Sequence, residues 1–255
     1  MIRQRQNVLD FDGPRLEALQ RHSFDYFLNE TSLANCLVAD RSQPGAPASI
    51  ASVGFALAAY PVGVERGWMT RLDAVERSLT LMRFFWNSPH GTAPDATGYK
   101  GFYYHFLDMQ TGRREGLCEL STIDSTFLLA GMLAAAEFFD GENEDEQELR
   151  TLAGALYGRA DWLWACNGEA TVCHGWMPES GFLPYRWEGY DEALLLYILG
   201  LGSPTHPLPA ESYAVWTSTY QWKEIYGYAF LYGGPLFIHQ YSHMWIDFRG
   251  IQDAF

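Results

Sequence analysis

The stretch that decides the fold runs from residue 118 to residue 141 and reads CELSTIDSTFLLAGMLAAAEFFDG. Its part from 121 to 139 predicts a strong helix, because apolar residues recur with helical periodicity and Asp140-Gly141 provides an end. Ser121 or Thr122 can serve as the N-cap. Two acids flank the start, Glu119 just before the helix and Asp124 in its first turn. The stretch therefore predicts a helix whose N-terminus carries two carboxylates.

Helical patterns also dominate the sequence on either side. The segment 49–60 is apolar nearly all round and rich in small residues, which predicts a helix buried on all sides. The segment 70–86 begins with Thr70 and has Asp73 at capping-box distance. Further helices are expected at 15–28, 144–164, 189–199 and 210–222, and 226–241 is expected to be a loop or a broken helix. The fold class predicted is all-α.

Two long aromatic loops, 89–114 and 167–188, separate these helices. Within the first, 101–109 can form a strand that turns at 110–113, which gives a small hairpin near 101–115. Long ordered loops in a compact domain are usually functional. No linker rich in Pro, Gly or Ser divides the chain, so we expect one domain over 1–255.

Composition and charge limit the classes of partner. Of the 255 residues, 48% are hydrophobic and 19% charged, as in globular proteins, and 16% are aromatic. Aromatic residues fill cores, but they also stack on flat ligands such as sugar rings. The formal net charge of −14 argues against binding of nucleic acid or of an anionic membrane surface. A neutral polymer remains an acceptable partner.

The cysteines and the N-terminus add further expectations. Cys36, Cys118, Cys166 and Cys173 show no metal-ligand spacing, so free thiols are the default, with a Cys166–Cys173 bridge left open. Residues 1–14 contain no apolar core of signal-peptide length, and no apolar run is long enough to span a membrane. No membrane insertion is expected.

Three acids are the candidates for catalysis: Glu119, Asp124 and Glu179. Glu119 and Asp124 could equally be cap or dipole partners of the helix that follows. Glu179 lies in WMPESGFLPY, residues 176–185, where Pro, Gly and aromatic neighbours are typical of a cleft, although a solvated loop acid is the alternative. Asp191 and Glu192 open the next helix, where capping is the simple explanation. Glycoside hydrolysis requires paired carboxylates of this kind, one of which donates a proton while the other activates water or attacks the sugar.

The histidines do not form a recognisable metal motif. His105, His239 and His243 lie in aromatic surroundings without the spacing of a zinc protease, so hydrogen-bonding roles are expected. No phosphate-binding loop and no Gly-x-Ser-x-Gly motif occurs. We expect neither a metal nor a cofactor.

Several motifs, taken together and in order, resemble the glycoamylase-like domain family, which includes endo-β-1,2-glucanases and is related to a domain of cyclic β-1,2-glucan synthases. The motifs are ADR (39–41), SIASVGFAL (49–57), VERG (64–67), RFFW (83–86), GYKGFYYHFLD (98–108), CELSTID (118–124), PESGFLP (178–184), GSPTH (202–206), HQYSH (239–243) and WIDFRG (245–250). They span nearly the whole chain, and the set is far more specific than any single motif.

The resemblance implies an (α/α)6 toroid with a sugar cleft at one end and a β-glucan, most simply β-1,2-glucan, as substrate. It implies that Glu119, Asp124 and Glu179 are cleft carboxylates, with Glu179 acting opposite one of the other two. Further groups are candidate sugar contacts, each with a scaffold role as the alternative: Arg41, Tyr99, Lys100, Tyr104, His105, Trp176, Tyr185, His239, Tyr241 and Arg249. Family members are often periplasmic or secreted.

Two departures from the family pattern affect these expectations. Family domains continue well past Ile251-Gln-Asp-Ala254, so the toroid is expected to lack its C-terminal part and to expose an apolar side through which copies could associate. Asp191 stands where Asn is expected. The alternative functions are a sugar-binding or inactive fragment and a helical-toroid lyase, although the acidic chain disfavours the anionic substrates of lyases.

Overall fold

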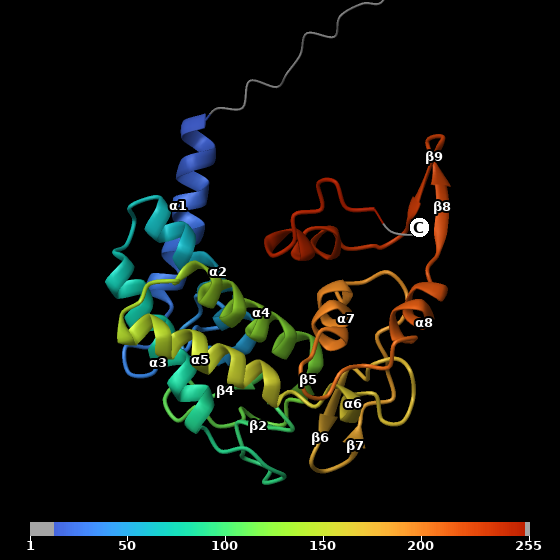
Figure 1. The fold of residues 1–255 in the computed structure, drawn as a ribbon, viewed down its shortest axis with the longest axis horizontal. Coiled ribbons are helices and arrows are strands. Elements are labelled where there is room, and N and C mark those ends of the chain that lie inside the picture. Colours follow the sequence, from blue (N-terminus) through green and yellow to red (C-terminus); the bar gives the residue numbers. More distant parts are fainter. Residues whose placement is uncertain (1–12, 253–255) are drawn as a thin grey trace, which may run out of the picture.

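The structure, a computed structural model, describes residues 13–252 and places two long buried helices at its centre. Helix α2 (Ile50–Glu65) and helix α4 (Thr122–Phe138) pack against each other over much of their length (Figure 1). Glycines allow this approach, because a Cβ on Gly131 would lie 2.1 Å from the carbonyl oxygen of Gly54, and one on Gly54 would lie 2.2 Å from that of Phe127. Two backbones in contact fix the relative position of the two helix N-termini.

Three more helices surround this pair. Helix α1 (Gly13–Asn29) packs on α2 through Phe24, and α3 (Arg71–Asn87) and α5 (Glu144–Arg159) pack on each other beside α4. Thr70 caps α3 by accepting a hydrogen bond from the Asp73 amide, as the capping-box spacing predicts. These helices bury the outer faces of the central pair.

Short strands lie at the N-terminal ends of the central helices, which corrects the prediction of an all-α fold. Five strands form an antiparallel sheet in the order β2 (Gly98–Tyr99), β3 (Phe102–Tyr104), β5 (Leu120–Ser121), β6 (Gly175–Met177) and β7 (Gly181–Phe182). A second pair joins β1 (Ala48–Ser49) to β4 (Phe106–Leu107). Strands of two or three residues are too short to show an alternating pattern in sequence. Each central helix begins directly after one of them.

The small hairpin expected near 101–115 is present in part. An antiparallel bridge pairs Leu107 with Arg114, and the Asp108 carboxylate accepts hydrogen bonds from the amides of Gln110 and Thr111 in the turn between them.

The C-terminal part departs most from the predicted helices. The segment 144–164 breaks at Ala160, which is extended, so that α6 (Trp162–Ala165) is a separate turn. Helix α7 (Leu194–Leu201) starts later than predicted, and α8 (Ser212–Ser218) ends earlier. The last segments are β8 (Trp222–Ile225), β9 (Tyr228–Leu231) and the 3-10 turns η1 (Leu236–His239) and η2 (Tyr241–Met244).

The β8–β9 hairpin follows from its turn. Tyr226 and Gly227 both have positive φ, 56° and 80°, as a two-residue type I′ turn requires. The Tyr-Gly pair therefore forms a hairpin where the sequence predicted the end of a helix at 222 and a loop or broken helix from 226.

The cysteines and the lengths of the helices answer two further expectations from the sequence. All four cysteines are free thiols, so the Cys166–Cys173 bridge is absent. None of the described helices has the length and apolar character needed to cross a membrane. Most of the N-terminal stretch 1–14, and residues 253–255, lie outside the described residues.

Candidate functional site

The junction between β5 and α4 positions two of the three predicted carboxylates. Ser121 caps α4 by accepting a hydrogen bond from the Asp124 amide, and its hydroxyl donates to Asp124 Oδ2 at 2.5 Å. Asp124 therefore points back toward the helix start rather than away along its side. Glu119, one residue before β5, extends over Gly175, where a Cβ would lie 3.2 Å from Glu119 Cγ. Both carboxylates thus lie at the same end of α4.

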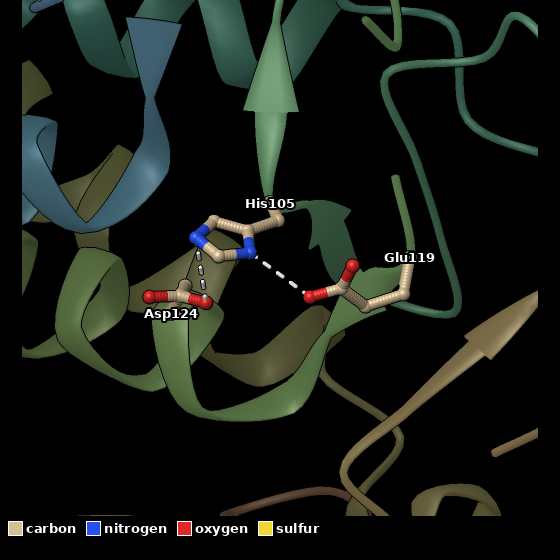
Figure 2. A group of neighbouring side chains, drawn as sticks. All are labelled: His105, Glu119 and Asp124. Atoms are coloured by element: carbon tan, nitrogen blue, oxygen red, sulfur yellow. Dashed lines mark hydrogen bonds and ion pairs between the residues drawn. The ribbon is translucent and has the colours of Figure 1, made fainter. Parts of the chain in front are cut away.

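His105, which directly follows β3, lies between these two acids. Its Nδ1 is 2.9 Å from Glu119 Oε1, and its Nε2 is 3.6 Å from Asp124 Oδ2. Figure 2 shows the ring with one carboxylate facing each nitrogen. The His105 amide also donates to the Glu119 carbonyl oxygen, which continues the β3–β5 ladder. The sheet register therefore places the imidazole between the acids.

The three groups set one another's charge. Burial opposes protonation of His105, but the hydrogen bond to Glu119 and the charges of both carboxylates outweigh it and raise the His105 pKa. Burial likewise opposes ionisation of Glu119, yet the hydrogen bond from His105 leaves its pKa lowered. Burial dominates at Asp124 and raises its pKa. The arrangement favours an imidazolium beside an ionised Glu119.

The same side chains could offer ligands to a metal, since one atom of each lies within 4.8 Å of the others. A histidine ligates through one nitrogen, however, and here each ring nitrogen faces a different carboxylate. The geometry suits an imidazolium that is hydrogen-bonded to Glu119 and ion-paired with Asp124 better than a metal ligand.

Glu192, which sequence analysis treated as a helix cap, belongs to this cluster. It lies just before α7, and its pKa is raised by burial, with the nearby Asp124 carboxylate adding to this effect. Burial and the charges of Glu192 and Asp124 also raise the pKa of the Tyr241 hydroxyl. A further carboxylate and a tyrosine from distant segments therefore lie near enough to Asp124 for their charges to interact, as Asp40 also does. The residue pair Asp191-Glu192 gave no indication of this, because acids at a helix start are common.

Glu179, the third predicted carboxylate, is held by an arginine. Arg114 Nη1 donates to Glu179 Oε1 at 2.7 Å and Nη2 to Oε2 at 3.2 Å. This bidentate bond leaves the Glu179 pKa lowered. The Arg114 side chain is 1% exposed, whereas that of Glu179 is 40% exposed. Glu179 is thus engaged in an ion pair rather than in the contacts around His105.

The predicted sugar contacts divide into two groups. Tyr241 lies beside the acids, and Tyr99 and Trp176 pack together with ring centroids 5.0 Å apart. Other candidates have structural partners: Lys100 pairs with Asp161, Arg41 with Asp40 and Arg249 with Asp247, while His239 packs on Tyr190. Tyr104 is fully buried beneath Arg114, and Tyr185 is exposed near His174.

Comparisons with known proteins give the family and the fold that this chain resembles. The family described as "Putative glucoamylase" matches residues 184–255. An exo-β-1,2-glucooligosaccharide sophorohydrolase of Parabacteroides distasonis is 24% identical over 96% of this chain. The resemblance to the glycoamylase-like family is confirmed. The match to the sophorohydrolase covers both the segment of Glu119 and that of Glu192.

Solved structures resemble this chain in fold. A "putative glucoamylase" from Bacteroides uniformis superposes with a TM-score of 0.85 and 29% identity, over 94% of this chain and 60% of that one. An endo-β-1,2-glucanase from Chitinophaga pinensis, in complex with sophorotriose and glucose, superposes with a TM-score of 0.79 and 24% identity, over 89% of this chain and 58% of that one. The chain spans 37% of the length of the sophorohydrolase.

Proposed function

We propose that this chain is a glycoside hydrolase domain that acts on a β-glucan, with β-1,2-glucan as the first substrate to test. The convergence of Glu119 and Asp124 on His105, with Glu192 beside them, carries the proposal. Paired carboxylates in different protonation states are the requirement for this reaction. The β-1,2-glucan relatives supply the substrate class.

The pair of acids that flanks the glycosidic bond is proposed to be Glu192 and Glu119. Glu119 and Asp124 each have a carboxylate oxygen within 4.8 Å of the other, with an imidazole between the two carboxylates. This separation is too short for an inverting pair, which needs about 6.5–9.5 Å, and although it is near the roughly 5 Å of a retaining pair, the imidazole occupies the space where a sugar would have to lie. We propose that the partner comes from another element and is Glu192, a largely buried carboxylate whose pKa is raised in part by the charge of Asp124. The charge of Asp40 also acts on His105 and Asp124, but Asp40 is paired with Arg41.

The protonation states suggest the roles of the two groups. Burial keeps the pKa of Glu192 raised, which suits a proton donor to the leaving oxygen. The hydrogen bond from His105 keeps Glu119 ionised, which suits a base that activates water. Asp124 would hold the other side of the imidazolium. No metal enters this scheme. We also propose that the helices form part of an (α/α)6 toroid with this site at one end.

The test is sugar release from linear β-1,2-glucan by the purified chain. Glu192→Gln and Glu119→Gln are each expected to lower kcat by roughly 10²- to 10⁴-fold, the usual contribution of a general acid or base. Glu115→Gln, an exposed acid on the loop before Glu119, is the matched control and should behave as wild type. Equal release by all variants would exclude the assigned roles.

The alternative is a domain that binds glucan without cleaving it. Calorimetry with β-1,2-glucooligosaccharides separates the two functions. Binding by the wild-type chain with no product over background would favour the alternative and reject hydrolysis.

A further inference from the structure

The ion pair between Arg114 and Glu179 has no part in the acid/base scheme, although the charge of Arg114 is buried. Two features make it unusual: the Arg114 side chain is 1% exposed, and all of its hydrogen bonds go to loops around the candidate site. A buried guanidinium must be fully paired to be tolerated. Its partners therefore show what it holds in place.

Arg114 joins three loops. Its Nε donates to the Cys118 carbonyl oxygen at 2.7 Å, its Nη1 donates to the Pro94 carbonyl oxygen at 3.2 Å, and the fork binds Glu179. Its guanidinium also lies over the Tyr104 ring, 4.6 Å from the centroid. Each of its three nitrogens therefore donates at least one hydrogen bond.

One of these contacts leads directly to the catalytic group. Cys118 precedes Glu119, and its thiol donates to the Phe106 carbonyl oxygen and accepts from the Phe106 amide. The Phe106 ring stacks on His105 with centroids 3.9 Å apart. Arg114 thus fixes the backbone at Cys118, just before Glu119. Cys118 in turn contacts Phe106, the residue after His105.

We infer that Arg114 and Glu179 are positioning residues, which hold Glu119 and His105 in register, and that Glu179 is not the acid or base. This inference rests on the proposed function of the same site. The Arg114 guanidinium binds the Cys118 carbonyl oxygen. The Glu179 carboxylate neutralises the charge of the guanidinium and fixes its orientation through the bidentate bond. Errors of about 1 Å at a reacting group can cost 10²-fold in rate.

Opposite pH effects provide the test. The Arg114 charge helps to lower the Glu119 pKa. Arg114→Met removes that charge, so the acid limb of the kcat profile should move to higher pH, by about half a pH unit. Glu179→Gln removes the neutralising carboxylate, so the acid limb should move to lower pH. Both variants are expected to lower kcat by about 10- to 100-fold with smaller changes in KM.

A matched control and a double variant complete the experiment. Arg113, the neighbouring and more exposed arginine, pairs with Asp95, and Arg113→Met should change neither kcat nor the pH profile. The double variant Arg114→Met/Glu179→Gln should lose no more activity than the worse single variant, because the two residues act as a unit. Activity at or below 10⁻³ of wild type in Glu179→Gln, together with near-normal Arg114→Met, would overturn the inference.

A second measurement does not depend on turnover. NMR titration of the His105 ring, assigned by the loss of its signal in His105→Gln, should give a higher His105 pKa in Arg114→Met and a lower one in Glu179→Gln. Unchanged titration in a folded Glu179→Gln protein would reject the inference even if the chain hydrolyses no glucan. The expected shifts in a chain without turnover would reject the proposed function alone. Glu179→Gln changes a partly exposed side chain, so the test does not depend on folding of the arginine variant.

Discussion

At the scale of single residues, the sequence identified the acids but not their partners. Glu119 and Asp124 could be found because they flank a recognisable helix start. Their connection through His105 could not be predicted, because it depends on the register between β3 and β5. Strands of two or three residues do not reveal their register in the sequence. Glu192 was missed for the same reason, because its neighbours come from α4 and η2. Glu179 stays a prediction as a catalyst, and its bond to Arg114 favours a different role.

The first prediction at this scale concerns His105. His105→Gln is expected to lose the stability that the raised His105 pKa provides. A histidine whose pKa is raised by folding stabilises the protein fully below its unfolded pKa of about 6.5, and this contribution disappears as pH rises through the folded pKa. Urea unfolding should therefore show a difference between wild type and variant that is largest at low pH. A difference that grows toward high pH would contradict the imidazolium.

The second prediction concerns Asp191. Burial raises the pKa of this carboxyl group to about 7. Because the folded protein holds this proton more tightly than the unfolded chain, Asp191 makes stability fall as pH rises from about 4 to about 7. Asn keeps the oxygen that accepts from the Ala193 amide. Asp191→Asn should therefore be more stable than wild type above pH 7 and nearly equal at pH 4. Thermal melts at both pH values check this, with Asp191→Ala as the variant that also loses the hydrogen bond from the Ala193 amide.

At the scale of elements, the long helices were predictable and the short strands were not. Residues 121–139 and 70–86 carried caps and periodicity, and the observed bounds differ by a residue or so. The central helices gave further evidence in their glycines, whose role became clear only from the contact between α2 and α4. The hairpin of β8 and β9 was missed because aromatic residues suit buried helices and strands equally.

The third prediction concerns the α2–α4 contact. Gly131→Ala would place a Cβ 2.1 Å from the Gly54 carbonyl oxygen, and the helices must separate to accept it. We expect a loss of about 1–3 kcal/mol in the free energy of unfolding, as for other overpacked cores. Gly154→Ala, on the open face of α5 with no atom near the added Cβ, is the control. It should gain about 0.5–1 kcal/mol from helix propensity. Urea denaturation distinguishes the two signs.

The fourth concerns the contact between β6 and Glu119. Gly175→Ala would place a Cβ 2.4 Å from the Leu120 carbonyl oxygen and 3.2 Å from Glu119 Cγ. The variant should lose both stability and glucan hydrolysis, since Glu119 must move away from His105. Gly168→Ala, in the loop before β6, meets no atom within 4 Å and should lose no hydrolysis, although its positive φ costs some stability. Full activity in a folded Gly175→Ala protein would contradict the position assigned to Glu119.

At the scale of the whole molecule, the motif set predicted more than any single pattern. The order of the motifs pointed to a glycoamylase-like chain, and the matching folds agree. The acidic composition argued against anionic partners and left a neutral polymer as an acceptable one, which stays a prediction. The sequence could not show that short strands lie at the N-terminal ends of both central helices. That arrangement brings segments near positions 105, 119 and 192 to one place.

The β8–β9 hairpin has a consequence for work with the protein at high concentration. It is a two-stranded sheet among the described residues, and Trp222, Tyr228 and Phe230 on it are exposed. Strand edges of this kind can pair with the same strand of another copy and start precipitation. A lysine placed on β9, rather than any change in the core, is therefore the first change to try if samples turn cloudy on concentration or storage.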